Sequence, residues 1–297
     1  MLVALILFVS IADEDFFSVP SLRTLAESAA PLLVLATGVT IVILCGGIDL
    51  SIAALASFTS VLFALWVPHL GLFAAVPVVA VAALAGAVQG VVHVVTQVPS
   101  FVVTLGGMAL WGGIALSVSG ATTISVTDRA VVRWSTERIL GLPVLVLAAL
   151  AIVGFVAATM QLTPFGRWVR AVGNSEPAAL LAGLPVLWVK ITAFSASGAC
   201  AGLAALMLVS RNYAGAPRLA DSLLLPAVAA IVVGGTAITG GHGGLGRTIV
   251  GVLIIGVLRV GLSSTGVDQA WEQIIYGSLI IGAVAVTIDR SKLSALK

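Results

Sequence analysis

The stretch that decides the fold starts at Ser51, where residues 51–90 read SIAALASFTSVLFALWVPHLGLFAAVPVVAVAALAGAVQG. These residues lie in a longer interval, 50–127, that contains no Asp, Glu, Lys or Arg. A helix needs about 20 apolar residues to cross the ~30 Å hydrocarbon core of a bilayer. The interval therefore predicts about three membrane crossings, with breaks at 68–71 and 98–100.

The composition of the whole chain supports the same conclusion. Of the 297 residues, 60% are hydrophobic and only 9% are charged, and the mean hydropathy is +1.20. A soluble domain carries about 25% charged residues. This chain lacks the polar residues to cover a water-facing surface, so we predict an integral membrane protein. The net charge of only +2 argues against nucleic acid as a partner.

Apolar segments recur along the entire sequence. We expect an all-α, polytopic membrane protein with about ten transmembrane helices, forming a single membrane domain over residues 1–297. The first segment is too short to cross alone, so we expect a shortened first helix that lacks part of its N-terminal end. The segments are 1–12, 25–45, 51–67, 72–95, 101–119, 143–161, 187–210, 222–238, 247–263 and 271–288.

Glycine pairs mark two kinds of feature. Residues 43–51 read ILCGGIDLS and residues 231–239 read IVVGGTAIT, so a glycine pair ends an apolar run in both. This match suggests an internal duplication, since repeats with interrupted helices are common in transporters. The small residues in 80–90 and 193–205, and the glycine pairs at 106–107 and 112–113, are instead typical of close helix packing.

Asp49 follows the first of these glycine pairs. An ionisable residue at membrane depth is a functional candidate by default. Alternatively, Asp49 or Ser51 caps the next helix by accepting hydrogen bonds from its first turn. The residues alone leave both interpretations open.

The sequence carries no recognisable catalytic or metal centre. Cys45 and Cys200 lie in apolar runs without a CxxC or Cys/His spacing, which is typical of buried thiols. Glycines at 241, 243 and 246 fit the dinucleotide pattern GxGxxG, but both flanks are membrane-length apolar segments. No Walker A phosphate-binding pattern is present. We therefore predict that the protein is not an enzyme and that this chain binds no metal or cofactor.

Residues 175–185, SEPAALLAGLP, predict a short helix within the polar stretch 163–185. Ser175 can accept hydrogen bonds at its N-terminus, and Glu176 places negative charge at the positive end of the helix dipole. Gly183 supplies the left-handed terminating position and Pro185 prevents continuation. A helix of about two turns is marginal in water. It is either an interfacial helix joining two crossings or a docking element for another protein.

Four stretches, in order along most of the chain, carry a family resemblance: GGIDLS at 46–51, VPSFVVTLGG at 98–107, TPFGRWVRAVGNSEPAALLAG at 163–183 and AVAAIVVGGTAITGGHGG at 227–244. They resemble the permease subunits of bacterial ABC sugar importers, the family that includes the ribose, xylose and galactose permeases. The resemblance is strong for the family and weak for the sugar.

The resemblance implies a membrane subunit that works in a complex. A second permease copy or a paralogue pairs with it, and two ATPase domains bind on the cytoplasmic side. An extracytoplasmic solute-binding protein delivers the solute. ATP and magnesium then bind to the ATPase subunits, and the chain is expected as a multi-pass protein in the bacterial inner membrane.

The resemblance also implies roles for residues. The stretch 163–185 resembles the coupling loop that sits in a groove of the ATPase, which places it in the cytoplasm; the Lys and Arg residues alone divide evenly between the two sides. The expected coupling residues are Gly166, Arg167, Glu176, Ala178, Ala179 and Gly183. The residues expected to shape the translocation pathway are Gly46, Gly47, Asp49, Ser51, Gly234 and Gly235.

We therefore predict the transmembrane permease of an ATP-driven importer for a monosaccharide of the pentose or hexose class. Alternatives with the same architecture import a nucleoside, a polyol, a signalling furanose or a branched-chain amino acid. A self-contained, ion-coupled secondary transporter usually carries several ionisable residues at mid-membrane, and this chain offers essentially Asp49. Two residues depart from the family pattern: Gln97 stands where a basic residue is common, and Arg259 stands where Asn is usual, which is expected to alter the outer mouth.

Overall fold

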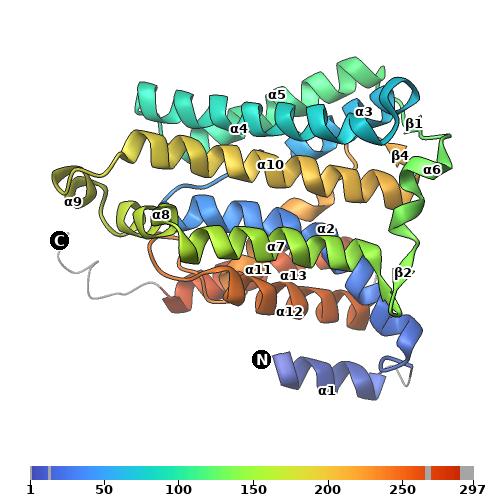
Figure 1. Cartoon of the computed structure of the whole chain (residues 1–297). Helices are drawn as coiled ribbons and strands as arrows, with labels where there is room; N and C mark the ends of the chain where they lie inside the picture. Colours follow the sequence, from blue (N-terminus) through green and yellow to red (C-terminus); the bar gives the residue numbers. More distant parts are fainter. Residues whose placement is uncertain (1, 13–14, 265–268, 288–297) are drawn as a thin grey trace.

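The computed structural model describes residues 2–12, 15–264 and 269–287, and these residues are mostly helical (Figure 1). The helices are α1 (Leu2–Ala12), α2 (Val19–Leu44), α3 (Ile52–Leu70), α4 (Ala75–Thr96), α5 (Ser100–Ser119), α6 (Arg129–Val132), α7 (Val144–Leu162), α8 (Pro164–Asn174), α9 (Glu176–Leu181), α10 (Val186–Asn212), α11 (Leu224–Val233), α12 (Leu245–Ser264) and α13 (Gln269–Thr287). Short 3-10 turns are η1 (Gly71–Ala74), η2 (Arg133–Ser135) and η3 (Asp221–Leu223).

Six runs in the described part of the chain are long and apolar enough to cross a membrane. They are Val19–Leu44, Ile52–Thr96, Ser100–Ser119, Val144–Leu162, Val186–Asn212 and Leu245–Ser263. The second run holds both α3 and α4, and the segments Asp221–Val233 and Trp271–Ala285 are shorter apolar helices. A polytopic helical membrane protein is therefore consistent with the structure, whereas the number of about ten crossings stays a prediction.

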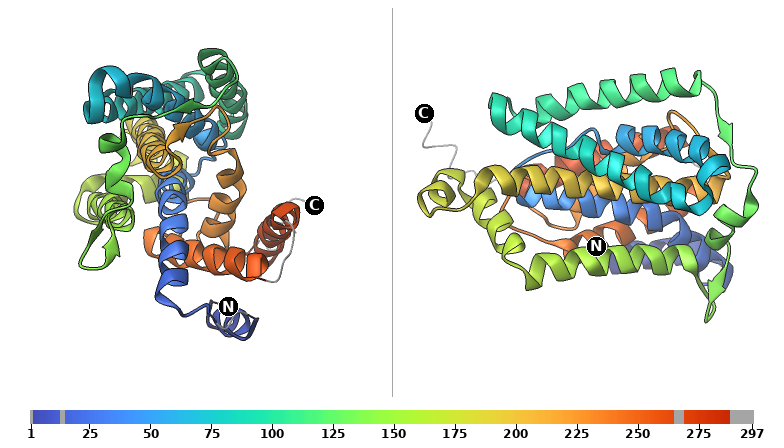
Figure 2. Two further views of the ribbon diagram at one scale, coloured as in Figure 1. Left: turned by 90° about the vertical axis from the view of Figure 1, so that its right-hand side faces the viewer. Right: turned by 45° about the horizontal axis from the view of Figure 1, so that its top comes forward.

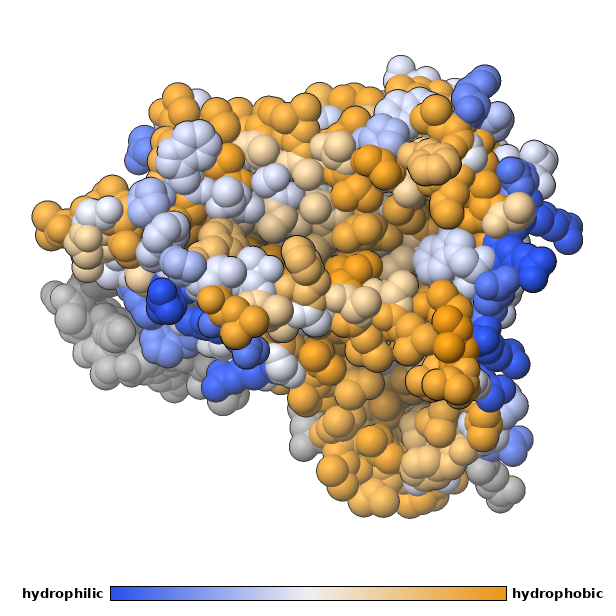
Figure 3. Space-filling view, viewed as in Figure 1, coloured by the Kyte–Doolittle hydropathy of each residue, from blue (hydrophilic) through white to orange (hydrophobic). Residues whose placement is uncertain are grey.

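The surface has a broad apolar band between polar ends (Figure 3). Large apolar side chains are exposed on the crossing helices; Leu84 on α4 is 65% exposed and Phe155 on α7 is 73% exposed. Contiguous apolar surface of this kind is rare on soluble monomers. It suits helices whose outer faces contact lipid.

The helical bundle has two different ends (Figure 1). Helices α8 and α9 lie at one end, which we name the α9 end. The other end, the strand end, carries α6 and four short strands. β1 (Ile124–Ser125) pairs antiparallel with β4 (Ala214–Gly215), and β2 (Arg138–Ile139) pairs antiparallel with β3 (Leu142–Pro143). The first pair ties the segment after α5 to the segment after α10.

Helix α2 forms the centre of the core. All its residues from Ala30 to Leu44 are buried, and α7, α10, α11 and α12 pack against it (Figure 2). The helix begins at Val19, earlier than the predicted segment 25–45, because Ser18 caps it by accepting from the Ser21 N–H at 3.3 Å. Pro20 is tolerated in that first turn because its missing N–H would be unpaired anyway.

Close packing through small residues is confirmed between α4 and α10. A Cβ atom on Gly86 would overlap the Phe194 carbonyl oxygen, and one on Gly198 would overlap the Ala82 carbonyl oxygen. The backbones of the two helices can approach so closely only because these side chains are absent.

On α5 the same prediction is confirmed only at Gly107 and stays a prediction for the other glycines. Gly107 packs closely against the Gln89 amide group, but Gly106, Gly112 and Gly113 face open space within this chain. Their small size is therefore not required by any helix packing that the described residues make.

We expect Gly198→Ala to destabilise the α4–α10 contact by about 1–3 kcal/mol, because overpacking forces backbone shifts. Gly113→Ala is the matched control, since it also replaces a helical glycine but meets nothing within 4 Å. The measurement is the midpoint of thermal unfolding in detergent. Equal midpoints for the two variants would contradict the packing argument.

Candidate coupling and translocation site

Helix α9 has the start and the end that the sequence predicts. The Ser175 hydroxyl accepts from the Ala178 N–H at 3.4 Å, and Gly183 adopts a left-handed conformation with φ +75°. Glu176 lies in the first turn. The helix spans Glu176–Leu181 and projects at the α9 end of the bundle (Figure 1).

The predicted coupling residues divide into an exposed and a buried group. Arg167, Ala178 and Gly183 are exposed at the α9 end, whereas Gly166 and Ala179 are buried within the chain. A Cβ atom on Gly166 would overlap the Met160 carbonyl oxygen. Gly166 therefore allows the tight turn between α7 and α8. Its burial leaves it no surface for a partner.

The exposed face of α9 is apolar. Leu180 is 57% exposed and Leu181 is 91% exposed, and the neighbouring Pro177 and Ala178 are exposed as well. Helix α8 beneath it is amphipathic and buries Val169 and Val172. The α8–α9 unit is thus packed on one side and presents small and apolar side chains on the other.

An ion pair fastens α9 to the next long helix. Lys190 Nζ on α10 donates to Glu176 Oε2 at 2.6 Å. The Lys190 side chain is 13% exposed and the Glu176 side chain 43% exposed. Glu176 therefore orients α9 relative to α10, a contact that the sequence analysis did not anticipate.

Three backbone segments meet without intervening side chains at what we name the glycine junction, formed by Gly46, Gly173 and Gly240. A Cβ atom on Gly173 would overlap the Leu44 carbonyl oxygen, and one on Gly240 would lie 2.8 Å from Gly46 Cα and 2.9 Å from the Gly173 carbonyl oxygen. The Gly241 N–H donates to the Leu44 carbonyl at 3.0 Å.

The glycine junction connects elements that are far apart in the sequence. Gly173 belongs to the end of α8, Gly46 follows α2, and Gly240 lies in the loop between α11 and α12. Gly46 and Gly240 have φ of +82° and +93°, which favour glycine. The end of α8 therefore contacts the segment after α2 and the loop between α11 and α12, while the internal duplication itself stays a prediction.

Asp49 is the centre of a buried hydrogen-bond network. It is 2% exposed. Its Oδ1 accepts from the Ser51 N–H at 2.9 Å and from the Ser51 hydroxyl at 2.7 Å, and its Oδ2 accepts from the Ser197 hydroxyl at 2.7 Å. Asp49 thus bonds Ser51, directly before α3, and joins it to α10, whereas the Ser51 side chain makes no capping bond to the first turn of α3.

Gln89 extends this network to α4. Its side-chain amide lies 2.9 Å from the Ser51 hydroxyl. The Ser51 hydroxyl has one hydrogen, which it can donate to Asp49 Oδ1 or to Gln89 Oε1. Gly107 on α5 leaves room for the same amide group. The network therefore joins the start of α3 to α4 and α10.

The remaining pathway candidates lie in two places. Gly47 packs beside Val42 and Ser100, next to the Asp49 network. Gly234 and Gly235 end α11, where the Arg247 guanidinium donates to the Gly235 carbonyl at 2.7 Å. Among the described residues, no hydrogen bond links Gly234 or Gly235 to Asp49. Their role in the pathway stays a prediction.

The described residues contain no cluster of three or more His, Cys, Asp or Glu side chains that could hold a metal ion. Cys45 and Cys200 are both buried, and both are free thiols. The site is thus built from backbone contacts, one buried carboxylate network and an exposed helix.

Comparison with known proteins places this architecture in a family. Residues 21–284 match the family described as the branched-chain amino acid transport system permease component. The chain belongs to this permease family. It is accordingly a multi-pass protein of the bacterial inner membrane, and membership favours an ABC permease over a self-contained secondary transporter.

Several relatives of the permease have named solutes. It is 33% identical to the ribose import permease protein of Haemophilus influenzae, over 95% of this chain and 90% of that protein. It is 33% identical to the ribose import permease protein of Escherichia coli K12, over 98% of this chain and 92% of that protein. It is 31% identical to the L-arabinose ABC transporter permease protein of Azospirillum brasilense, over 96% of this chain and 85% of that protein.

Proposed function

We propose that this permease is the membrane-spanning subunit of an ATP-driven importer for a monosaccharide of the pentose or hexose class. The solute class is supported by the relatives that import ribose and L-arabinose. The partners are a second permease copy or a paralogue, two ATPase domains and an extracytoplasmic binding protein. ATP and magnesium bind to the ATPase domains, and this chain performs no covalent chemistry.

The observation that carries the coupling role is the contact of α8, through the glycine junction, with the segment after α2 and the loop between α11 and α12. The apolar face of α9 is the surface that docks the ATPase, so the α9 end is cytoplasmic. Burying a side chain such as Leu181, which is 91% exposed, contributes about 1.5–3 kcal/mol. Movement of the docked α9 then displaces α8 and, through Gly173, the backbone around Gly46 and Gly240.

Helix α10 provides a second connection between α9 and the pathway. Lys190 pairs with Glu176 on α9, and Ser197 donates to Asp49. The two residues are about two turns apart, so they lie on the same side of α10. A rigid shift of α10 therefore moves the Asp49 network together with α9, which suits an alternation between two arrangements of the bundle.

The proposal is tested by reconstituting the permease in vesicles with the ATPase and binding protein encoded beside it. We expect uptake of radiolabelled D-ribose or L-arabinose that requires ATP. L-Leucine tests the branched-chain amino acid alternative. Uptake that persists without ATP and collapses with the ion gradient would refute the proposed importer.

Reversing one charge of the ion pair tests the α9–α10 connection. We expect Lys190→Glu to reduce ATP-dependent uptake several-fold, and the double variant Glu176→Lys with Lys190→Glu to restore part of it. A partly exposed pair contributes about 0.2–1 kcal/mol, so the effect on unfolding is small. The control is Arg133→Glu, which breaks the exposed 2.9 Å pair with Glu137 at the strand end. If the Lys190→Glu variant and the Arg133→Glu control transport equally, Glu176 does not orient α9.

A further inference from the structure

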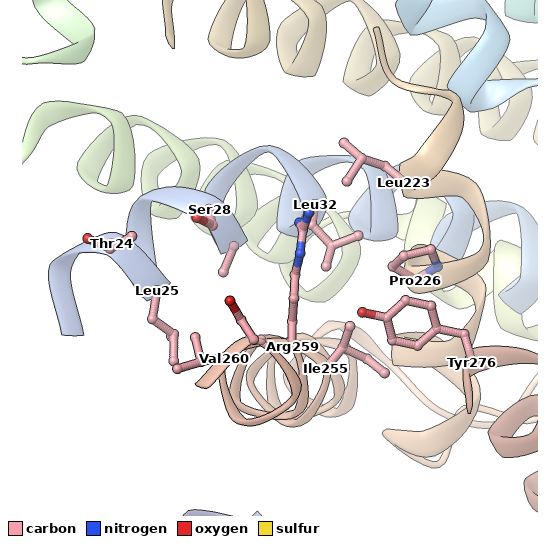
Figure 4. Close-up of a pocket in the computed structure, with 13 residues that line it drawn as sticks. Thr24, Leu25, Ser28, Leu32, Leu223, Pro226, Ile255, Arg259, Val260 and Tyr276 are labelled. Carbon is pink, nitrogen blue, oxygen red and sulfur yellow. The ribbon is translucent and has the colours of Figure 1, made fainter. Parts of the chain in front are cut away.

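A cavity of about 260 Å³ lies beside the first part of α2 (Figure 4). Its walls come from α2, α11, α12 and α13, with a contribution from η3. Thr24 and Ser28 lie near the start of α2, and Ser263 lies near the end of α12. The cavity is therefore distant in the fold from the glycine junction and from α9.

One wall of the cavity carries an ion pair, so the two charges cancel. Arg259 Nε on α12 lies 3.6 Å from Glu272 Oε2 on α13, and the Tyr276 hydroxyl donates to the same carboxylate oxygen at 3.4 Å. Figure 4 shows Arg259 reaching from α12 toward α2, with the Tyr276 hydroxyl directed at it. Arg259 lies in the last two turns of α12 and Glu272 in the first turn of α13, so the ion pair links the two helices near their ends.

The geometry leaves much of the Arg259 guanidinium available. Its side chain is 44% exposed, whereas that of Glu272 is 14% exposed. A separation of 3.6 Å is longer than a good hydrogen bond, and arginine has five N–H donors. Most of these donors can therefore bond a solute while the ion pair holds the side chain across the cavity.

Much of the remaining lining is apolar, and it includes Leu32, Leu223, Pro226 and Ile255. A monosaccharide has the matching chemistry, because hydroxyl groups surround a ring whose C–H groups are apolar. The volume of about 260 Å³ is slightly below the ~300–1,000 Å³ typical of ligand pockets, which suits a small solute.

We propose that this cavity is an entry subsite that binds a neutral, polyhydroxylated solute of monosaccharide size, with Arg259 as its hydrogen-bonding residue. The subsite rests on the proposed sugar import, and it lies on the side from which the binding protein delivers the solute. Neutral solutes fit because Glu272 already balances the charge of Arg259.

The test is protection of an introduced thiol in the full-length permease in lipid nanodiscs. Ser263→Cys places a thiol at the exposed rim of the cavity, and both native cysteines are buried. The rate of modification by a hydrophilic maleimide is measured with D-ribose, L-arabinose, D-galactose or D-galacturonate at millimolar concentration. Thr136→Cys, exposed at the same end and outside the cavity, is the control thiol.

We expect at least one neutral sugar to slow labelling of Ser263→Cys and none to affect Thr136→Cys. Adding Arg259→Gln should raise the sugar concentration for half-protection roughly tenfold, whereas Arg133→Gln should not change it. Because the protection measurement needs no Arg259 variant, misfolding of Arg259→Gln leaves the test intact.

Two results would overturn the subsite. In one, no sugar protects Ser263→Cys; in the other, only the anionic D-galacturonate protects it. If ATP-dependent sugar uptake occurs without protection, the subsite is wrong and the proposed function stands. If uptake of all sugars is absent in the reconstituted complex, the proposed function fails independently of the labelling result.

Discussion

Gly173→Ala is expected to reduce ATP-dependent uptake to near background while the permease still inserts into the membrane. The added Cβ atom would overlap the Leu44 carbonyl oxygen and would lie 2.6 Å from the Gly241 nitrogen. Both neighbours are backbone atoms, so no side-chain rotation can make room. The end of α8 must move away, which separates α8 and α9 from the segment after α2 and from the loop between α11 and α12. The measurement is uptake together with the rate of ATP hydrolysis in the reconstituted complex.

Gly154→Ala on α7 is the matched control for this variant. It also replaces a helical glycine by alanine, but nothing lies within 4 Å of the new Cβ atom. We expect it to transport at the original rate. In Gly173→Ala, ATP hydrolysis that continues without transport indicates lost coupling. Normal uptake by Gly173→Ala would disprove transmission through the glycine junction.

The second large effect is expected for Asp49→Ala. Removing the carboxylate leaves the Ser197 hydroxyl and the Ser51 N–H buried without their acceptor. Each buried unsatisfied group costs about 1–3 kcal/mol, so we expect a loss of roughly 3 kcal/mol in the free energy of unfolding and a corresponding loss of uptake. Unfolding is followed by temperature in detergent.

Asp128→Ala supplies the comparison for Asp49→Ala. Asp128 caps α6 by accepting from the Ala130 N–H at 3.0 Å, but it is exposed, so its loss costs only about 0.5–2 kcal/mol. Adding Ser197→Ala to Asp49→Ala removes one stranded donor and should recover part of the stability. If the Asp49 and Asp128 variants unfold at the same temperature, the network does not hold the helices together.

Much of the fold could be predicted because membrane-crossing helices require long apolar runs, which are easily seen in a sequence. The charge-free interval 50–127 holds α3, α4 and α5, since hydrocarbon excludes charge and demands helix. Ser175 and Gly183 define α9 through capping and left-handed geometry, which are local effects. Helix α8 was missed, although Phe165, Val169 and Val172 recur at helical spacing.

The candidate site depended on contacts that no local pattern contains. Gln89 and Ser197 are isolated polar residues in apolar helices, and only the packing of α4 and α10 brings them to Ser51 and Asp49. The glycine pairs indicated the ends of α2 and α11 correctly. The sequence could not indicate that Gly173 lies between them, because that contact depends on tertiary structure.

The glycine junction has a mechanical consequence. Side chains in ordinary helix contacts can change rotamer and so absorb small displacements. Three backbones in direct contact have no side-chain torsions that could absorb a displacement. A shift of Gly173 must therefore be matched at Gly46 and Gly240, or the Gly241–Leu44 hydrogen bond breaks. The exchange rate of the Gly241 amide hydrogen with deuterated solvent therefore reports whether these three backbones stay in contact during the transport cycle.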